Sequence, residues 1–311
     1  MNRVTLGKTN LQVSRISLGT AEIGFNYGIG ERPLLDTGRA DSFLKQGLEL
    51  GINFFDTANY YGEAEKRLGQ SGLTRETGVV IETKCAQFLE KGEYFSDKEI
   101  EDKIRAQVAD SLSKLKLSIL DILMLHGPSQ EQLADGKLIK IMHKLKQEKL
   151  IRFLGISSRG EENALAALNT DIDVLQVAYS VLDQRMAKHV FPLAQNLGVG
   201  IVSRSTLLKG ALTPLRHQLP EKLLPLKLQA DKINQLAEEN HMDLPTLAIR
   251  FALSNHYIAS VLIGTNKIDN LQKAVLASEA GPLPEKILHQ LEKLQLTDLE
   301  QIDPAKWPPL K

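Results

Sequence analysis

Eight short runs of strand-forming residues recur along the chain, separated by segments with helical signatures. The runs cover residues 15–20, 52–58, 79–84, 120–126, 151–157, 173–180, 200–205 and 260–265. Their apolar character is nearly continuous, as expected of parallel strands that are buried on both faces. Strand and helix alternating eight times predict a (β/α)8 TIM barrel, a fold of the α/β class.

The segments around these runs complete the predicted architecture. Residues 3–15 read as a β-hairpin that would plug the base of the barrel. Ser96 and Glu99 have the spacing of a capping box, and Pro284 opens one of the extra C-terminal helices. Because no linker-like stretch interrupts the pattern, residues 1–311 are expected to form a single barrel domain.

A doubly wound dinucleotide-binding sheet is the rival architecture. It requires the spacing G-x-G-x-x-G directly after the first strand. Residues 16–25, ISLGTAEIGF, lack that spacing, and Gly198 and Gly200 precede a strand instead of following one. The barrel is therefore preferred.

Charge and cysteine content narrow the classes of function. Lys plus Arg equals Asp plus Glu at 38 each, and no basic block stands out, which argues against a nucleic-acid partner. No signal-peptide core and no apolar run of membrane-spanning length are visible, and the single cysteine, Cys85, fits a reducing compartment. We expect a cytoplasmic protein with a small-molecule partner, and the sequence leaves its oligomeric state open.

Polar side chains close nearly every apolar run. In barrels of this kind the active site lies at the carboxyl ends of the strands. These ends carry Asp56, Lys84, His126, Ser157, Gln176 with Tyr179, and the run Ser203, Arg204, Ser205. Each of these residues taken singly is more often structural, so it is their coincidence at one rim that indicates a site.

An aspartate, a lysine, a tyrosine and a histidine at one rim suit proton transfer coupled to carbonyl chemistry. A phenol is a weak acid at neutral pH, but an ammonium beside it lowers its pKa. Lys84 is placed to act in this way on Tyr61. A buried lysine keeps its charge only beside a carboxylate, and Asp56 supplies one.

The motifs around these residues resemble those of the aldo-keto reductases over nearly the whole chain. The matching stretches are FDTANYYGEAEKRLG, VIETK, DILMLH, FLGISS, LQVAYS and LIGT. The resemblance implies an oxidoreductase with the catalytic tetrad Asp56, Tyr61, Lys84 and His126. In that family the tyrosine is the general acid or base and the histidine orients the carbonyl, so Tyr60 is interpreted as a packing or substrate-side residue.

The same resemblance implies a nicotinamide cofactor across the barrel mouth, exchanging hydride from ring C4 with an aldehyde, ketone or aldose-like substrate. The positions that match cofactor contacts of the family are Gly19, Thr20, Asp56, Ser157, Gln176, Tyr179, Ser203, Arg204, Ser205, Leu207, Lys209, Gly264, Thr265 and Lys267. By this match Ser157 and Gln176 hold the carboxamide, Tyr179 stacks on the nicotinamide, and residues 203–209 wrap the pyrophosphate.

The adenine end departs from the family pattern. The usual arginine, which clamps a 2′-phosphate, and the following Glu-Asn pair are replaced here by Asn270, Lys273 and Ala274. Lys267 or Lys273 could bind such a phosphate as a point charge, or both could be solvated lysines on a helix. NADP(H) is favoured on this basis, and NAD(H) is possible.

Other functions stay open at the level of sequence. A cofactor-binding regulatory subunit with little turnover would keep the same fold, and a Schiff-base lyase would use Lys84 as its nucleophile. Residues 155–160, GISSRG, are one residue too long for the G-x-S-x-G motif of hydrolases. No histidine pair has metal-ligand spacing, so no metal site is expected.

Loops at 21–33, 86–97 and 207–225 are expected to set substrate specificity. Their aromatic residues could line a pocket or simply pack the loops; they include Phe25, Tyr27, Phe88, Tyr94 and Phe95. The mixture of aromatic and polar side chains favours a sugar or a small polar carbonyl compound as substrate.

Overall fold

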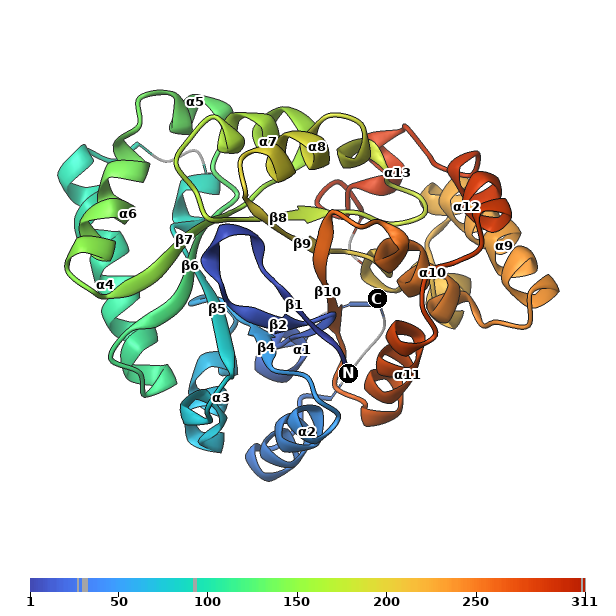
Figure 1. The fold of residues 1–311 in the computed structure, drawn as a ribbon. Helices are drawn as coiled ribbons and strands as arrows, with labels where there is room; N and C mark the ends of the chain where they lie inside the picture. Colours follow the sequence, from blue (N-terminus) through green and yellow to red (C-terminus); the bar gives the residue numbers. More distant parts are fainter. Residues whose placement is uncertain (27, 30–32, 92–93, 309, 311) are drawn as a thin grey trace.

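Eight parallel strands close into a barrel in the computed structural model, which describes residues 1–26, 28–29, 33–91, 94–308 and 310. The strand order is β10-β3-β4-β5-β6-β7-β8-β9, with helices surrounding the barrel (Figure 1). The strands are β3 (Ile16–Gly19), β4 (Phe54–Asp56), β5 (Val80–Cys85), β6 (Leu120–His126), β7 (Ile151–Ser157), β8 (Val174–Ala178), β9 (Gly200–Arg204) and β10 (Ile258–Gly264). Each of the eight predicted runs overlaps one of them, so the (β/α)8 prediction is confirmed.

The helices follow the strands in the expected alternation, and further helices extend the C-terminal part. The α-helices are α1 (Ala21–Gly24), α2 (Thr37–Glu49), α3 (Ala64–Ser71), α4 (Asp97–Leu115), α5 (Gln130–Ala134), α6 (Lys137–Gln147), α7 (Gly160–Leu168), α8 (Val190–Asn196), α9 (Leu224–Glu239), α10 (Leu244–Ser254), α11 (Ile268–Glu279), α12 (Glu285–Glu292) and α13 (Leu299–Ile302). Both predicted helix starts are confirmed, because Ser96 and Glu99 form a reciprocal capping box and α12 begins directly after Pro284. Within the described part of the chain, no helix is both long and apolar enough to traverse a bilayer.

Short 3-10 turns shape the remaining connections. They are η1 (Gly7–Thr9), η2 (Leu73–Arg75), η3 (Gln87–Lys91), η4 (Arg185–Ala187), η5 (Leu208–Gly210), η6 (Pro214–Gln218) and η7 (Glu221–Leu223). Three of them lie between 207 and 225, so the stretch that looks irregular in sequence is a series of tight turns leading into α9.

An antiparallel hairpin closes the base of the barrel, as predicted. It consists of β1 (Arg3–Thr5) and β2 (Gln12–Ser14) and lies across one end of the barrel (Figure 1). Leu6 and Val13 of this hairpin pack in one apolar cluster with the lower barrel interior. The contact is close: Gly7 has a φ of +51°, and a Cβ built there would lie 2.3 Å from the backbone nitrogen of Gly200.

Side-chain alternation divides the barrel interior into an apolar base and a polar mouth. Every second residue of a barrel strand faces inward. The lower inward positions hold Phe54, Val80, Ile122, Val174 and Val202. Two residues further along, four of these five strands carry polar side chains, namely Asp56, Glu82, Gln176 and Arg204. The fold therefore places a buried polar layer directly above a water-excluded floor.

Candidate active site

Asp56 and Lys84 lie on neighbouring strands at the centre of the polar layer. Asp56 ends β4 and is in register with Glu82, two residues before Lys84 on β5. The Lys84 ammonium donates to Asp56 Oδ2 and to the backbone oxygen of Thr57, the latter at 3.0 Å. Its Nζ lies 5.2 Å from the centroid of the Tyr61 ring. The predicted acid, ammonium and phenol therefore come together.

Tyr60, Tyr61 and His126 form an aromatic group above this pair. The Tyr60 ring lies 4.9 Å from the Tyr61 ring and 5.0 Å from the His126 ring, measured between centroids. Tyr61 and His126 lie 6.4 Å apart by the same measure, and all three line one cavity. Burial, and then the neighbouring Tyr61, raise the pKa of Tyr60, which makes Tyr60 a poor proton donor.

His126 ends β6 and is neutral at any physiological pH. Burial lowers its pKa to about 2, with further lowering from the cations Lys84, Arg204 and Arg159. Its Nδ1 atom is buried and has no hydrogen-bond partner among the described residues. A neutral imidazole still carries one N–H, so His126 can donate a hydrogen bond to an oxygen in the cavity.

Gln176 on β8 links the polar layer across the barrel. Its amide nitrogen donates to Asp56 Oδ2 at 2.8 Å and to Glu82 Oε1, while its amide oxygen accepts from the Ser157 hydroxyl at 3.1 Å. Glu82 is fully buried and was missed by sequence reasoning. The signal was present, because Glu82 has the same inward parity as Lys84 on β5.

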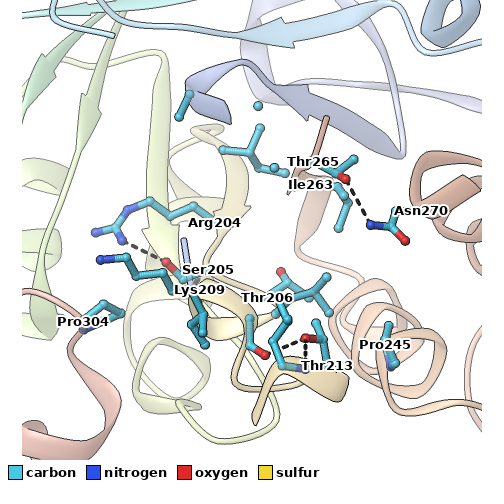
Figure 2. Close-up of a pocket in the computed structure, with 18 of the residues that line it drawn as sticks. Arg204, Ser205, Thr206, Lys209, Thr213, Pro245, Ile263, Thr265, Asn270 and Pro304 are labelled. Carbon is cyan, nitrogen blue, oxygen red and sulfur yellow. Dashed lines mark hydrogen bonds between the residues drawn. The ribbon is translucent and has the colours of Figure 1, made fainter. Parts of the chain in front are cut away.

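A cavity of about 830 Å³ extends from these residues along the barrel mouth. Figure 2 shows Arg204, Ser205 and Lys209 on one side of it and Thr265 with Asn270 on another. Arg204 donates to the backbone oxygen of Ser158 at 2.9 Å and to the Ser205 hydroxyl at 3.2 Å, which holds its guanidinium at the wall. The volume is in the range of ordinary ligand sites.

Strained backbone is concentrated beside these cations. Ser205, Leu208 and Lys209 all have positive φ, and they are three of the eight non-glycine residues with this conformation in the described chain. Such conformations cluster at ligand-binding segments, where the surrounding structure enforces them. Together with two cationic side chains, this turn is suited to an anion such as a pyrophosphate.

Eleven of the fourteen predicted cofactor residues line this cavity. They are Gly19, Asp56, Ser157, Gln176, Arg204, Ser205, Leu207, Lys209, Gly264, Thr265 and Lys267. Tyr61 and His126 line the same cavity, so the residues predicted to be catalytic and those predicted to bind the cofactor share one continuous space.

Sequence comparison agrees with this arrangement. The sequence model of the Aldo/keto reductase family matches residues 15–295. The chain belongs to the aldo/keto reductase family. It is 28% identical to L-galactose dehydrogenase from Arabidopsis thaliana, across 97% of this chain and 96% of that protein. It is also 28% identical to the NADH-specific methylglyoxal reductase of Escherichia coli, across 89% and 93%.

Structure comparison gives the same family. The holo form of an aldo-keto reductase from Bacillus halodurans superposes with a TM-score of 0.78 at 29% sequence identity. The match covers 94% of this chain and 96% of that one. The eight-stranded barrel, the N-terminal hairpin and the C-terminal helices are thus features of this aldo/keto reductase that solved relatives share.

Three of the predicted cofactor residues, Thr20, Ser203 and Tyr179, do not line the cavity. The Thr20 hydroxyl donates to the backbone oxygen of Asp56 at 2.9 Å, and the Ser203 hydroxyl donates to that of Tyr179 at 3.2 Å. Both contacts brace strand ends. In this aldo/keto reductase, the side chains of Thr20 and Ser203 therefore brace the site and do not line the cavity.

Tyr179 is the third, and its placement corrects the stacking role expected for it. Its ring is 4% exposed and packs against Phe191 and Phe251, with centroid distances of 5.1 and 5.5 Å. Its hydroxyl accepts from the Asn255 amide at 3.4 Å. The ring packs between these two phenylalanines and does not line the cavity, so its position does not match the stacking role.

The far end of the cavity carries a mixed set of charges. Lys273 Nζ lies 3.5 Å from Asp243 Oδ2, and the Asn270 amide donates to the Thr265 hydroxyl at 3.2 Å. All four residues line the cavity, whereas Ala274 is fully buried and does not. Lys273 therefore meets the carboxylate of the residue that caps the N-terminus of the neighbouring helix α10.

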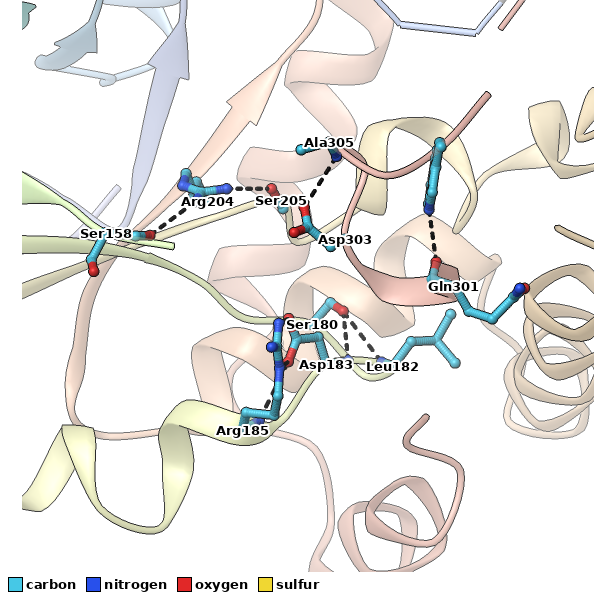
Figure 3. A network of polar contacts seen from close by, with 11 residues as sticks. Ser158, Ser180, Leu182, Asp183, Arg185, Arg204, Ser205, Gln301, Asp303 and Ala305 are labelled. Carbon is cyan, nitrogen blue, oxygen red and sulfur yellow. Dashed lines mark hydrogen bonds and ion pairs between the residues drawn. The ribbon is translucent and has the colours of Figure 1, made fainter. Parts of the chain in front are cut away.

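A C-terminal segment that sequence reasoning did not assign to the site also lines the cavity. Asp303, Pro304 and Ala305 follow α13, and Figure 3 shows Asp303 and Ala305 close to Arg204 and Ser205. The Asp303 carboxylate accepts from the Ala305 amide at 3.0 Å, which shapes the turn. Segments about one hundred positions apart that line one cavity leave no local signal of this in the sequence.

Of the two alternatives for the loop aromatics, lining a pocket or packing the loops, the described residues do not show the first. Phe88 and Phe95 pack edge to face at 5.3 Å, Tyr94 is 93% exposed, and Phe25 lies 5.8 Å from the Tyr61 ring. None of these four lines the cavity, and Tyr27 lies outside the described residues. Across the described chain, no cluster of three or more potential metal ligands occurs.

Proposed function

We propose that this chain is an NAD(P)-dependent oxidoreductase that interconverts a carbonyl compound and the corresponding alcohol. The observation that carries the proposal is the buried Asp56–Lys84 pair beside Tyr61, at the floor of a cavity that His126 also lines. An acid, a cation and a hydrogen-bond donor then converge on one point, as reduction of a carbonyl requires. A bound nicotinamide would supply or accept the hydride.

The protein's own groups have separate tasks in this proposal. Tyr61 protonates the developing alkoxide oxygen, or removes the hydroxyl proton in the oxidative direction. The Lys84 ammonium stabilises the tyrosinate that results, and Asp56 keeps the ammonium in place. His126, being neutral, donates a hydrogen bond that fixes the carbonyl oxygen.

The cavity fits an extended dinucleotide. Arg204, Lys209 and the strained turn at 205–209 lie between the catalytic residues and the far end, where they would hold the pyrophosphate. Ser157 and Gln176 would hold the carboxamide, although the Gln176 amide nitrogen is already shared between Asp56 and Glu82.

For the nucleotide, we propose NAD(H), against the preference for NADP(H) that the sequence suggests. Lys273, one of the two candidate partners for a 2′-phosphate, is paired with Asp243. A carboxylate at the adenosine end accepts a hydrogen bond from a ribose 2′-hydroxyl and repels a 2′-phosphate, as in the dinucleotide-binding sheets. The word NADH-specific in the name of one relative supports the same choice.

For the substrate, we propose a small polyhydroxylated aldehyde or aldose. Tyr60 and Arg159, both on the cavity wall near His126, offer polar contacts to hydroxyl groups. The names of similar proteins include L-galactose dehydrogenase, D-threo-aldose 1-dehydrogenase and L-glyceraldehyde 3-phosphate reductase.

The test is a titration of the purified protein with NADH and with NADPH, followed by nucleotide fluorescence, and then a panel of aldoses, aldehydes and ketones. Binding of a reduced nucleotide and turnover of at least one carbonyl compound are expected. If neither nucleotide binds, the proposal is wrong. Tight binding without turnover of any compound would instead favour a regulatory subunit.

A further inference from the structure

Glu82 is a second carboxyl group in the polar layer, and the tetrad does not account for it. It lies on β5 with 0% of its surface exposed. Below it are the apolar side chains of the barrel floor, among them Val80, Ile122 and Val174. The charged groups that face it are Asp56 from β4 and Lys84 from its own strand, while β8 contributes the uncharged Gln176.

The hydrogen bonds around Glu82 leave one of its oxygens without a donor. Oε1 accepts from the Gln176 amide nitrogen, which also donates to Asp56 Oδ2. Oε2 is buried and has no partner donor among the described residues. The Asp56 carboxyl also interacts with Glu82, and it has no proton to offer when it is paired with Lys84. A hydrogen bond between the two acids therefore needs a proton on one of them.

The charge balance of Lys84, Asp56 and Glu82 indicates that Glu82 is the acid that holds this proton. The Lys84 ammonium balances one carboxylate, and its ion pair with Asp56 identifies that carboxylate as Asp56. An ionised Glu82 would leave an uncompensated negative charge in the barrel interior, an arrangement that proteins avoid. Burial, followed by the charge of Asp56, raises the pKa of Glu82 well above its ordinary value, and Lys84 and Gln176 offset this only in part.

We propose that Glu82 is a positioning residue: a neutral carboxylic acid that donates a hydrogen bond to Asp56 and accepts one from Gln176. Asp56 then receives three donors, from Lys84, Gln176 and Glu82. This fixes the carboxylate beneath the ammonium that faces Tyr61, and it also fixes the amide that accepts from Ser157. The inference about catalysis rests on the proposed function, whereas the protonation state of Glu82 does not.

The test compares Glu82→Gln with Glu82→Ala. A glutamine reproduces a neutral acid, because its oxygen accepts from Gln176 and its amide nitrogen donates to Asp56. We expect near wild-type turnover and nucleotide affinity for Glu82→Gln. For Glu82→Ala we expect a loss in turnover of about tenfold or more and a changed pH profile, because the Asp56 carboxylate beneath Lys84 is no longer held in place. If Glu82→Gln is as impaired as Glu82→Ala, an ionised carboxylate is required and the proposal is overturned.

Two readouts do not depend on turnover. Infrared difference spectra of wild type and Glu82→Gln at neutral pH should show the C=O stretch of a protonated carboxylic acid, shifted in heavy water; its absence would overturn the proposal. Because the folded state keeps a proton that the unfolded state loses, wild-type stability should fall as pH rises above the ordinary glutamate range, and less so in Glu82→Gln. These results hold even if no carbonyl compound is turned over.

A matched control is Glu65→Gln. Glu65 is another buried glutamate, 1% exposed, whose carboxylate accepts from the Thr83 hydroxyl and which does not line the cavity. Its replacement should leave the kinetic pH profile unchanged. If Glu65→Gln alters that profile as much as Glu82→Ala does, the effect is a general one of buried acids and the proposal fails.

Discussion

Asp56 and Lys84 form an ion pair in which neither side chain is more than 2% exposed. Adjacent parallel strands bring them together, and the apolar floor below excludes water. A pair in this environment is costly to break, because the remaining partner becomes an uncompensated buried charge. The Asp56–Lys84 pair therefore contributes both to the stability of the barrel and to the proposed chemistry at its mouth.

Replacing Lys84 by Met tests that link. We expect the free energy of unfolding at pH 7 to fall by about 3–5 kcal/mol, since Asp56 loses its counter-ion inside the barrel. The double variant Asp56→Asn with Lys84→Met should lose less than the sum of the two single variants. Urea denaturation measures both quantities. Lys66→Met, which breaks an exposed pair with Glu63, is the control and should cost little; equal losses for Lys84→Met and Lys66→Met would contradict the argument.

The variant Tyr61→Phe tests which of the two neighbouring tyrosines, Tyr60 or Tyr61, is the general acid. We expect turnover to fall by at least about a hundredfold, as for loss of a general acid, with nucleotide affinity little changed. Tyr60→Phe is the matched variant, and its effect should be smaller because Tyr60 is 40% exposed and has a raised pKa. Steady-state kinetics measures the turnover, and fluorescence titration measures the nucleotide affinity. A larger loss in Tyr60→Phe would show that the roles are reversed.

His126 should stay neutral over the whole range in which the protein is folded. Burial lowers its pKa to about 2, so the ring gains no proton as pH falls from 8 to 5. The unfolded chain does bind that proton below about pH 6.5, so His126 makes stability fall as pH decreases through this range. NMR of the ring carbon-bound protons is the measurement, with His126→Asn used for assignment. A His126 resonance that titrates between pH 5 and 8 would rule out the neutral donor.

The strands, and the clustering of Asp56, Lys84 and His126, could be predicted from sequence because nearly every apolar run ends in a polar residue. Asp56, Lys84 and His126 occupy the last or nearly last positions of their strands, where a parallel barrel places its site. The sequence does not reveal the position of each residue along the barrel axis. Asp56 is in register with Glu82 and not with Lys84, a relation that depends on how the strands are staggered.

Side-chain parity explains the remaining differences. On β8, Gln176 faces inward, so Tyr179, an odd number of residues further along, lies on the side of the surrounding helices. On β9 the same rule turns Ser203 outward and Arg204 inward. Arg204, not Tyr179, is thus the planar side chain that reaches the cavity. This alternation is readable in the sequence, whereas the contribution of residues 303–305 depends on tertiary packing alone.

Asp243 decides the choice of nucleotide if the proposal for NAD(H) is right. Its carboxylate lies 3.5 Å from Lys273 and also accepts from the Thr246 amide as the cap of α10. Asp243→Asn keeps the capping oxygen and removes the charge, so the fold should be retained. We expect the ratio of the NADPH to the NADH dissociation constant to fall by about tenfold, because repulsion of the 2′-phosphate is removed.

Nucleotide fluorescence titrations at low and high salt measure this ratio for Asp243→Asn. The shift should shrink at high ionic strength, since charge on the rim of a cavity is screened. Asp269→Asn is the control, because Asp269 is exposed on the first turn of α11 and does not line the cavity. A wild-type protein that already binds NADPH more tightly than NADH would contradict the assignment, and would mean that Lys267 or Lys273 engages the phosphate in spite of the neighbouring carboxylate.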